Sequence, residues 1–168
     1  MWWLAIVPFL LQAFAIFLDE GVFHIRRGLP KWERIGHPLD TLTVLLCMGF
    51  VIWIPFSKTA LIIYISFCIF SSLFVTKDEF VHKEHCPASE QWLHAVLFTL
   101  HPIALAMAGF IWPVVQGVSL EGWMFSWLDN PEALRRFLYG QFVAMSGFLI
   151  YQILFWNVLW KPKADGEG

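Results

Sequence analysis

The sequence predicts an all-α integral membrane protein, a bundle of five (or alternatively four) transmembrane helices. Of its 168 residues, 58% are hydrophobic and only 14% are charged, whereas soluble domains average about 25% charged residues. The apolar residues fall in long blocks, and a helix needs roughly 20 apolar residues to cross a bilayer. The chain therefore has room for one membrane domain, residues 1–160, and a polar tail at 161–168, without a separate soluble domain.

The apolar blocks predict the positions of the spans. They fall at about residues 2–24, 38–56, 59–85, 90–111 and 131–160. Pro38 and Pro131 are predicted to begin the second and fifth spans, because proline is well accommodated in the first turn of a helix. The segment 112–130 mixes Gly, Trp and Phe, and Trp favours the membrane–water boundary. We therefore expect an interfacial loop or a helix lying flat there.

The basic residues predict the orientation. If the N-terminus lies outside, the connections after the first and third spans and the C-terminus are cytoplasmic. Those segments carry Arg26, Arg27, Lys31, Arg34, Lys77, Lys83, Lys161 and Lys163, against Lys58, Arg135 and Arg136 on the other side. Cytoplasmic loops are enriched in Lys and Arg. We expect an inner (cytoplasmic) membrane protein with its N-terminus outside and its C-terminus inside.

On this topology all six histidines fall at the cytoplasmic ends of the helices, and acids accompany them. An acid stands four residues before a histidine at Glu20–His24, Glu33–His37, Asp78–His82 and Glu90–His94. Residues at this spacing share one face of a helix. Imidazole and carboxylate together suit iron, zinc and manganese, and ionisable groups near the hydrocarbon indicate function.

The number of such groups predicts a site for two metal ions, most simply iron, with zinc as the alternative. The expected ligands are Glu20, His24, His37, Asp40, Asp78, His82, His85, Glu90, His94 and His101. Glu79 is expected to be a bridging or supporting catalytic group, since Glu79 and His82 have the Glu-x-x-His spacing of di-iron carboxylate proteins. The competing interpretation is that charged side chains at helix ends simply face water or pair with neighbouring basic residues.

Histidines gathered at the cytoplasmic ends of membrane helices resemble those of the integral-membrane non-haem di-iron enzymes, the fatty-acid hydroxylases, desaturases and related lipid oxygenases. The resemblance covers residues 19–101. Those enzymes use His-x-x-x-His and His-x-x-His-His motifs, whereas this chain has His82-Lys-Glu-His85 and more carboxylates, in which it is similar to ferritin-like proteins. The resemblance implies a lipid-phase substrate, dioxygen and an electron donor, with hydroxylation or desaturation as the reaction.

Four other functions fit parts of the pattern. A membrane zinc hydrolase, such as a protease or lipid amidase, needs one metal to polarise water and a carboxylate base. A b-type haem protein needs deep histidine pairs, and only His101 is deep. A metal-ion carrier needs acids along a path to both faces, and the opposite face holds only Glu121, Asp129 and Glu132. A purely structural subunit needs no site. The sequence has no basic patch of the kind that would indicate nucleic-acid binding. It leaves the oligomeric state open.

Overall fold

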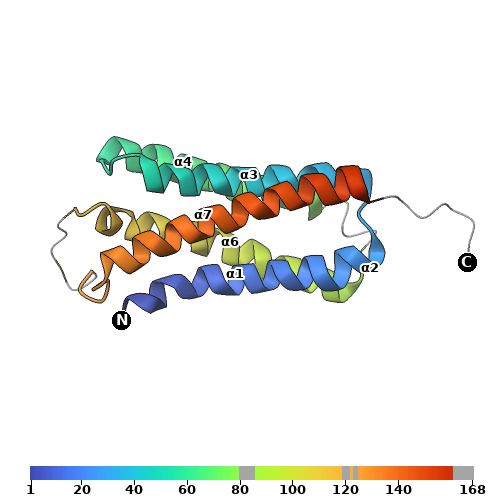
Figure 1. Ribbon diagram of the computed structural model, residues 1–168, viewed down its shortest axis with the longest axis horizontal. Helices are drawn as coiled ribbons and strands as arrows, with labels where there is room; N and C mark the ends of the chain where they lie inside the picture. Colours follow the sequence, from blue (N-terminus) through green and yellow to red (C-terminus); the bar gives the residue numbers. More distant parts are fainter. Residues whose placement is uncertain (80–85, 119–121, 123–124, 161–168) are drawn as a thin grey trace, which may run out of the picture.

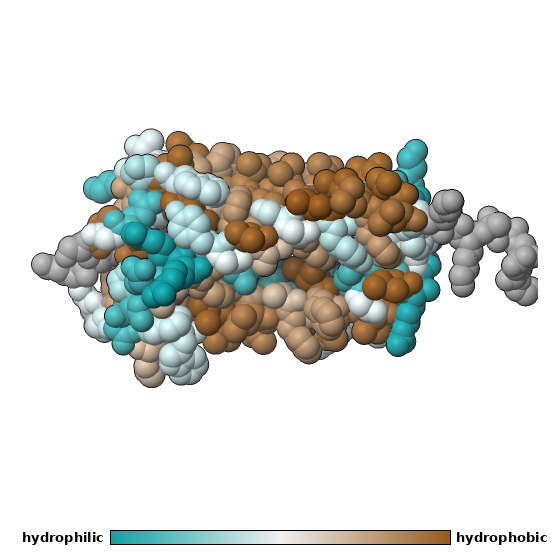
Figure 2. Space-filling view, in the orientation of Figure 1, coloured by the Kyte–Doolittle hydropathy of each residue, from teal (hydrophilic) through white to brown (hydrophobic). Residues whose placement is uncertain are grey.

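A computed structural model shows a bundle of five long helices (Figure 1). The structure describes residues 1–79, 86–118, 122 and 125–160. The protein is 86% helical, and the described residues form no strand. All five helices are long and apolar enough to cross a membrane. The flanks of the bundle are largely hydrophobic, and hydrophilic residues gather at its two ends (Figure 2). The prediction of an all-helical chain with five candidate spans is confirmed.

Several of the five helices change their winding along their length. The first consists of the 3₁₀ turn η1 (Trp2–Ile6), α1 (Val7–Leu18), the π-helical turn η2 (Asp19–His24) and α2 (Ile25–Arg27). It is followed by α3 (Lys31–Trp53), then α4 (Lys58–Phe74) with the 3₁₀ turn η3 (Val75–Asp78). The last two are α6 (Ala88–Val115) and α7 (Pro131–Leu154), which continues as the π-helical turn η4 (Phe155–Leu159).

The second span begins earlier than predicted. α3 begins at Lys31, so Pro38 lies inside the helix and not in its first turn. Proline cannot donate the helical hydrogen bond to the carbonyl four residues earlier, which is that of Arg34. The side-chain amide of Asn157 donates to this carbonyl at 3.1 Å instead. Neighbouring helices commonly satisfy backbone groups that proline frees in membrane proteins, and a sequence pattern does not show such a partner.

The remaining boundaries differ less. Pro131 begins α7 as predicted, and the Asn130 side chain caps the helix by accepting from the amide of Ala133 at 3.0 Å. The predicted continuation of the third span over residues 80–85 lies outside the described residues. Trp112 does not begin an interfacial loop, because α6 continues to Val115 and Trp112 is fully buried.

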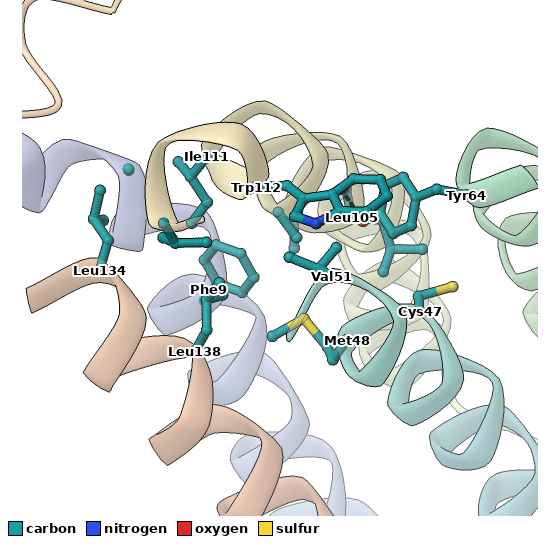
Figure 3. Close-up of a cluster of buried hydrophobic side chains, with 14 of the residues drawn as sticks. Phe9, Cys47, Met48, Val51, Tyr64, Leu105, Ile111, Trp112, Leu134 and Leu138 are labelled. Carbon is teal, nitrogen blue, oxygen red and sulfur yellow. Dashed lines mark hydrogen bonds between the residues drawn. The ribbon is translucent and has the colours of Figure 1, made fainter. Parts of the chain in front are cut away.

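The hydrophobic core lies at the end of the bundle where α3 ends and α7 begins (Figure 3). The Trp112 ring packs against the rings of Phe50, Phe56 and Tyr64, with centroids 5.2 to 5.6 Å apart. The Tyr64 hydroxyl donates to the carbonyl of Leu105 at 2.6 Å. This aromatic packing joins α3, α4 and α6 at one end and leaves the other end of the bundle to polar side chains.

Candidate metal centre

Buried acids and histidines from two helices converge at the end of the bundle opposite this core. Asp19 and His24 come from η2, and Glu90 and His94 come from the first two turns of α6. Each offers one ligand atom, and these atoms all lie within 4.8 Å of one another. All four residues are buried. This group, called the four-residue group below, could hold a metal ion.

A second set of ligand atoms overlaps the first. His24, Glu33 and His37 also lie within the same 4.8 Å limit of one another, and Glu33 and His37 come from the start of α3. The ring centroids of His24 and His37 are 4.8 Å apart. His24 therefore stands between the two sets, and three helices contribute to the combined centre.

The π-helical turn explains how two consecutive acids face one histidine. In η2 the wider winding brings residues five apart onto one side of the helix, while residues four apart remain close. His24 consequently meets Asp19 through Nε2, 3.3 Å from Oδ2, and Glu20 through Nδ1, 3.0 Å from Oε2. Single π-helical turns occur frequently at functional sites.

Glu20 fixes the orientation of the His24 ring. Its Oε1 accepts hydrogen bonds from the Tyr151 hydroxyl and the Trp156 indole, both at 2.7 Å, while Oε2 faces His24 Nδ1. A carboxylate in this position favours the tautomer with the proton on Nδ1. In that tautomer Nε2 of His24, which has no hydrogen-bond partner among the described residues, would present its lone pair to a metal ion between Asp19 and Glu90. Glu20 thus lies behind the centre.

Removing the two hydrogen bonds that hold Glu20 should weaken metal binding without removing a metal ligand. We expect the double variant Tyr151→Phe/Trp156→Phe to bind metal about 10- to 100-fold more weakly, since supporting partners of metal-ligating histidines have effects of this size. The measurement is a competition titration with a chelating dye in detergent. Tyr139→Phe is the control, because Tyr139 is 43% exposed and lies on α7 away from Glu20. Equal affinities of the double variant and the wild type would contradict this role of Glu20.

Charge favours a cation at the centre. Arg27 donates to Glu33 Oε2 and Glu90 Oε1, both at 2.8 Å. One positively charged guanidinium is therefore shared by two buried carboxylates. The ion-pair partners of Asp19 in the described part of the chain are His24 and His94, which are charged only when protonated. Burying carboxylates without compensating charge is costly. A divalent cation between Asp19 and Glu90 would provide that compensation.

Cys86 lies next to the charged groups of the centre. It is buried just before α6, and burial raises the pKa of its thiol to about 12. The thiol is therefore protonated at neutral pH, and Cys86 belongs to neither set of converging ligand atoms. The Gln91 side chain donates to the Cys86 carbonyl at 2.9 Å, which stabilises the turn into α6.

The structure places His101 in a separate hydrogen-bonded chain, about 10 Å further along α6 than His94. The Gln12 amide lies 3.3 Å from Nδ1, and the Ser71 hydroxyl lies 2.9 Å from Nε2. Ser71 in turn bonds Thr43 at 2.7 Å, and Thr43 donates to the Asp40 carbonyl at 2.8 Å. Because an amide N–H can only donate, Nδ1 accepts and Nε2 donates to Ser71. Neither nitrogen is open for a metal or haem in this arrangement.

The other predicted ligands are distributed as follows. The Asp40 carboxylate pairs with Lys77 at 2.6 Å and is in neither ligand set. Glu79 is half-buried at the end of the described third helix. The Asp78 side chain, His82 and His85 lie outside the described residues, and their roles stay predictions. Asp19, Glu33 and Arg27 are part of the centre but were not among the predicted site residues.

A cavity of about 580 Å³ connects the centre with the interior of the bundle. Asp19, His24, His37 and His94 line one end of it. From there it continues between α1, α3, α6 and α7, where its wall is largely apolar, with Phe9, Ile16, Met48, Leu105, Met145 and Phe148. On the face shown in Figure 2 a crevice is visible between α7 and α1.

No protein-family model, no curated protein and no solved structure matches this chain. The structure alone therefore describes the class of protein: it is all-helical, with five candidate membrane spans and a buried histidine–carboxylate centre that could hold a metal ion.

Proposed function

We propose that this protein is a membrane-embedded metalloenzyme that binds iron and uses dioxygen to hydroxylate or desaturate a lipid-phase substrate. One observation carries the proposal: four of the six converging residues, Asp19, His24, His37 and His94, line the polar end of a cavity whose remaining wall is largely apolar. Pockets that bind small molecules are typically apolar with a few polar groups at one place. A metal centre at such a place would meet the hydrocarbon part of a bound molecule.

The ligand set fits iron, and two ions fit better than one. The four-residue group would hold the first ion, and Glu33 and His37 would contribute to a second, with His24 between them. Mixed imidazole and carboxylate ligands are typical of non-haem iron, and di-iron carboxylate sites draw their ligands from several helices of one bundle. The basic residues Arg26, Arg27, Lys31 and Arg34 at this end favour a cytoplasmic position for the centre, which a soluble electron donor could reach.

The reaction balances with an external reductant. Iron bound here would supply the activation of dioxygen. In hydroxylation one C–H bond of the substrate becomes C–OH and the second oxygen atom leaves as water, with two electrons and two protons from the donor. In desaturation two C–H bonds are lost and both oxygen atoms leave as water, again with two electrons and two protons from the donor. The apolar wall excludes water from the reacting carbon, and Glu20 keeps His24 in its ligand orientation.

Zinc hydrolysis is the second candidate. The four-residue group alone supplies enough nitrogen and oxygen atoms for one zinc ion, which typically takes three or four protein ligands. The carboxylate base would then be Glu33, which is buried next to the group on α3 and would have to act while bonded to Arg27. This reaction needs neither dioxygen nor an electron donor, so the two candidates give different results in one experiment.

The test uses membranes from cells that produce the protein, incubated with ¹⁸O₂ and a reductant. We expect extracted lipids that either gain ¹⁸O or lose two hydrogen atoms, in wild-type membranes and in those with Glu132→Gln, whose side chain is 71% exposed at the other end of the bundle. Both changes should be lost with His94→Ala. Lipids unchanged by oxygen, together with stoichiometric zinc in the purified protein, would overturn the proposal in favour of hydrolysis.

A further inference from the structure

With the five candidate spans placed across a bilayer, the candidate metal centre would lie at the depth where the hydrocarbon meets the headgroups. The 28 residues of α6 make a helix about 42 Å long, which exceeds a hydrocarbon core of about 30 Å. Glu90 and His94 stand in the first two turns of α6, about 3 to 9 Å from its start. His24 stands three residues before the end of α2 at Arg27. The centre is thus near the edge of the hydrocarbon layer.

From this depth the cavity extends inward by about one lipid leaflet. His94 and Leu105 both line it and are eleven residues apart on α6, which corresponds to about 16 Å. His37 and Met48 give the same separation on α3. Half of the hydrocarbon core is about 15 Å. The length of the cavity therefore matches the chain of a lipid whose headgroup is level with the centre.

The cavity opens at the side of the bundle between α1 and α7, on the surface that would face a bilayer. α1 packs on α6, whereas α7 packs mainly on α3, so these two helices form opposite sides of the cavity. Phe17 on α1 is 71% exposed although it lines the cavity, and Ala13 and Ala144 are also exposed cavity residues on α1 and α7. A chain can therefore enter sideways from the lipid phase without passing the polar end.

The wall suits hydrocarbon along this length. Two of its polar pairs are bonded internally, Gln12 with His101 and Thr41 with Gln152. Their hydrogen-bonding capacity is thereby used within the protein, and an alkyl chain beside them leaves no polar atom of these pairs newly unsatisfied. The volume of about 580 Å³ lies in the usual range for small-molecule pockets, about 300 to 1,000 Å³.

We propose that this cavity binds one hydrocarbon chain of a membrane lipid, with the methyl end beside Met48 and Leu105 and the headgroup end at the four-residue group. This inference rests on the proposed function and specifies its substrate: the atoms presented to the centre are the carbons next to the headgroup, and mid-chain carbons lie too deep. The same orientation follows whether the chain belongs to a free fatty acid or to a phospholipid.

The orientation is tested by photo-crosslinking in nanodiscs of phosphatidylcholine. Two palmitic acid probes carry a diazirine either beside the carboxyl group or at the methyl end, and mass spectrometry locates the labelled peptides. We expect the first probe to label residues around Phe17 and Phe148, and the second to label those around Phe9 and Met48. The same labelling pattern from both probes, or the reverse pattern, would overturn the orientation.

Variants at the mouth separate the cavity from the surrounding lipid. Ala144→Trp should abolish labelling of the cavity peptides, because an indole fills the opening. Val143→Trp should leave it unchanged, since Val143 is 69% exposed on the same helix and does not line the cavity. Equal labelling in both variants would overturn the proposal.

Glu90→Gln distinguishes failure of this inference from failure of the proposed function. One possible result is that the wild type binds no metal, but both the wild type and Glu90→Gln show the expected labelling. This result would support the lipid site and contradict the proposed enzymatic function. Oxidised lipid formed by the wild type, with labelling that does not depend on Ala144, supports the enzyme and contradicts the lipid site described here.

Discussion

Asp19→Asn and His94→Ala should each weaken metal binding at least about 100-fold. Each variant removes one of four ligand atoms that lie within 4.8 Å of one another, and loss of a supporting partner alone has effects of about 10- to 100-fold. Asparagine has nearly the same shape as aspartate, so the first variant removes charge without creating a cavity. His94 Nε2 lies 3.1 Å from Asp19 Oδ1, so both variants act on the same contact.

The measurement is metal content per chain after purification, followed by a competition titration with a chelating dye. Glu132→Gln is the matched control, because it also removes one carboxylate charge but at an exposed position. Circular dichroism and gel filtration verify that each variant is folded and monodisperse. Wild-type affinity in folded Asp19→Asn and His94→Ala would show that the converging atoms are only a hydrogen-bonded cluster.

Arg27→Met should lower the free energy of unfolding of the metal-free protein by about 3 to 5 kcal/mol. The guanidinium bonds Glu33 and Glu90, whose side chains are at most 1% exposed. Removing one partner of a buried ion pair typically has a cost of this size, because a buried charge is left uncompensated. Bound metal should recover part of the loss, since a cation at Glu90 replaces some of the missing positive charge.

Thermal unfolding in detergent, with chelator and with added metal, measures this prediction. Arg136→Met is the control, because Arg136 is 75% exposed and its contact with Glu132 is 3.8 Å long. Such a surface change is expected to stay within about 0.5 kcal/mol. Adding Glu33→Gln to Arg27→Met should restore part of the stability. Equal melting temperatures for Arg27→Met and Arg136→Met would contradict the assignment of this ion-pair network.

Much of the fold follows from the sequence because the bilayer imposes simple rules. Long apolar blocks predict spans, and five candidate spans are present. The helix boundary at Pro38 could not be predicted, since the bond that tolerates this proline comes from Asn157, more than a hundred residues away along the chain. The prediction that Trp112 begins an interfacial segment was wrong for the same reason, because the burial of Trp112 depends on contacts from α3 and α4.

The centre was partly visible in the spacing of acids and histidines. Members of three of the four i, i+4 pairs, those at His24, His37 and His94, meet at one end of the bundle, and the fourth pair includes His82, outside the described residues. The Glu33–His37 spacing could have added Glu33 to the predicted ligands. Asp19 could not be found this way, because its approach to His24 depends on a π-helical turn that no spacing rule indicates.

X-ray absorption on the purified, folded protein would show directly whether the histidine–carboxylate centre binds metal. Cells would be supplied with iron, zinc and manganese, and metal content would be determined on the same sample. We predict one or two ions per chain, with imidazole among nitrogen and oxygen ligands at about 2.0 to 2.2 Å and loss of this signal in His94→Ala. A folded, monodisperse wild-type protein that retains no metal, and takes up none when it is offered, would show that this centre is not a metal site.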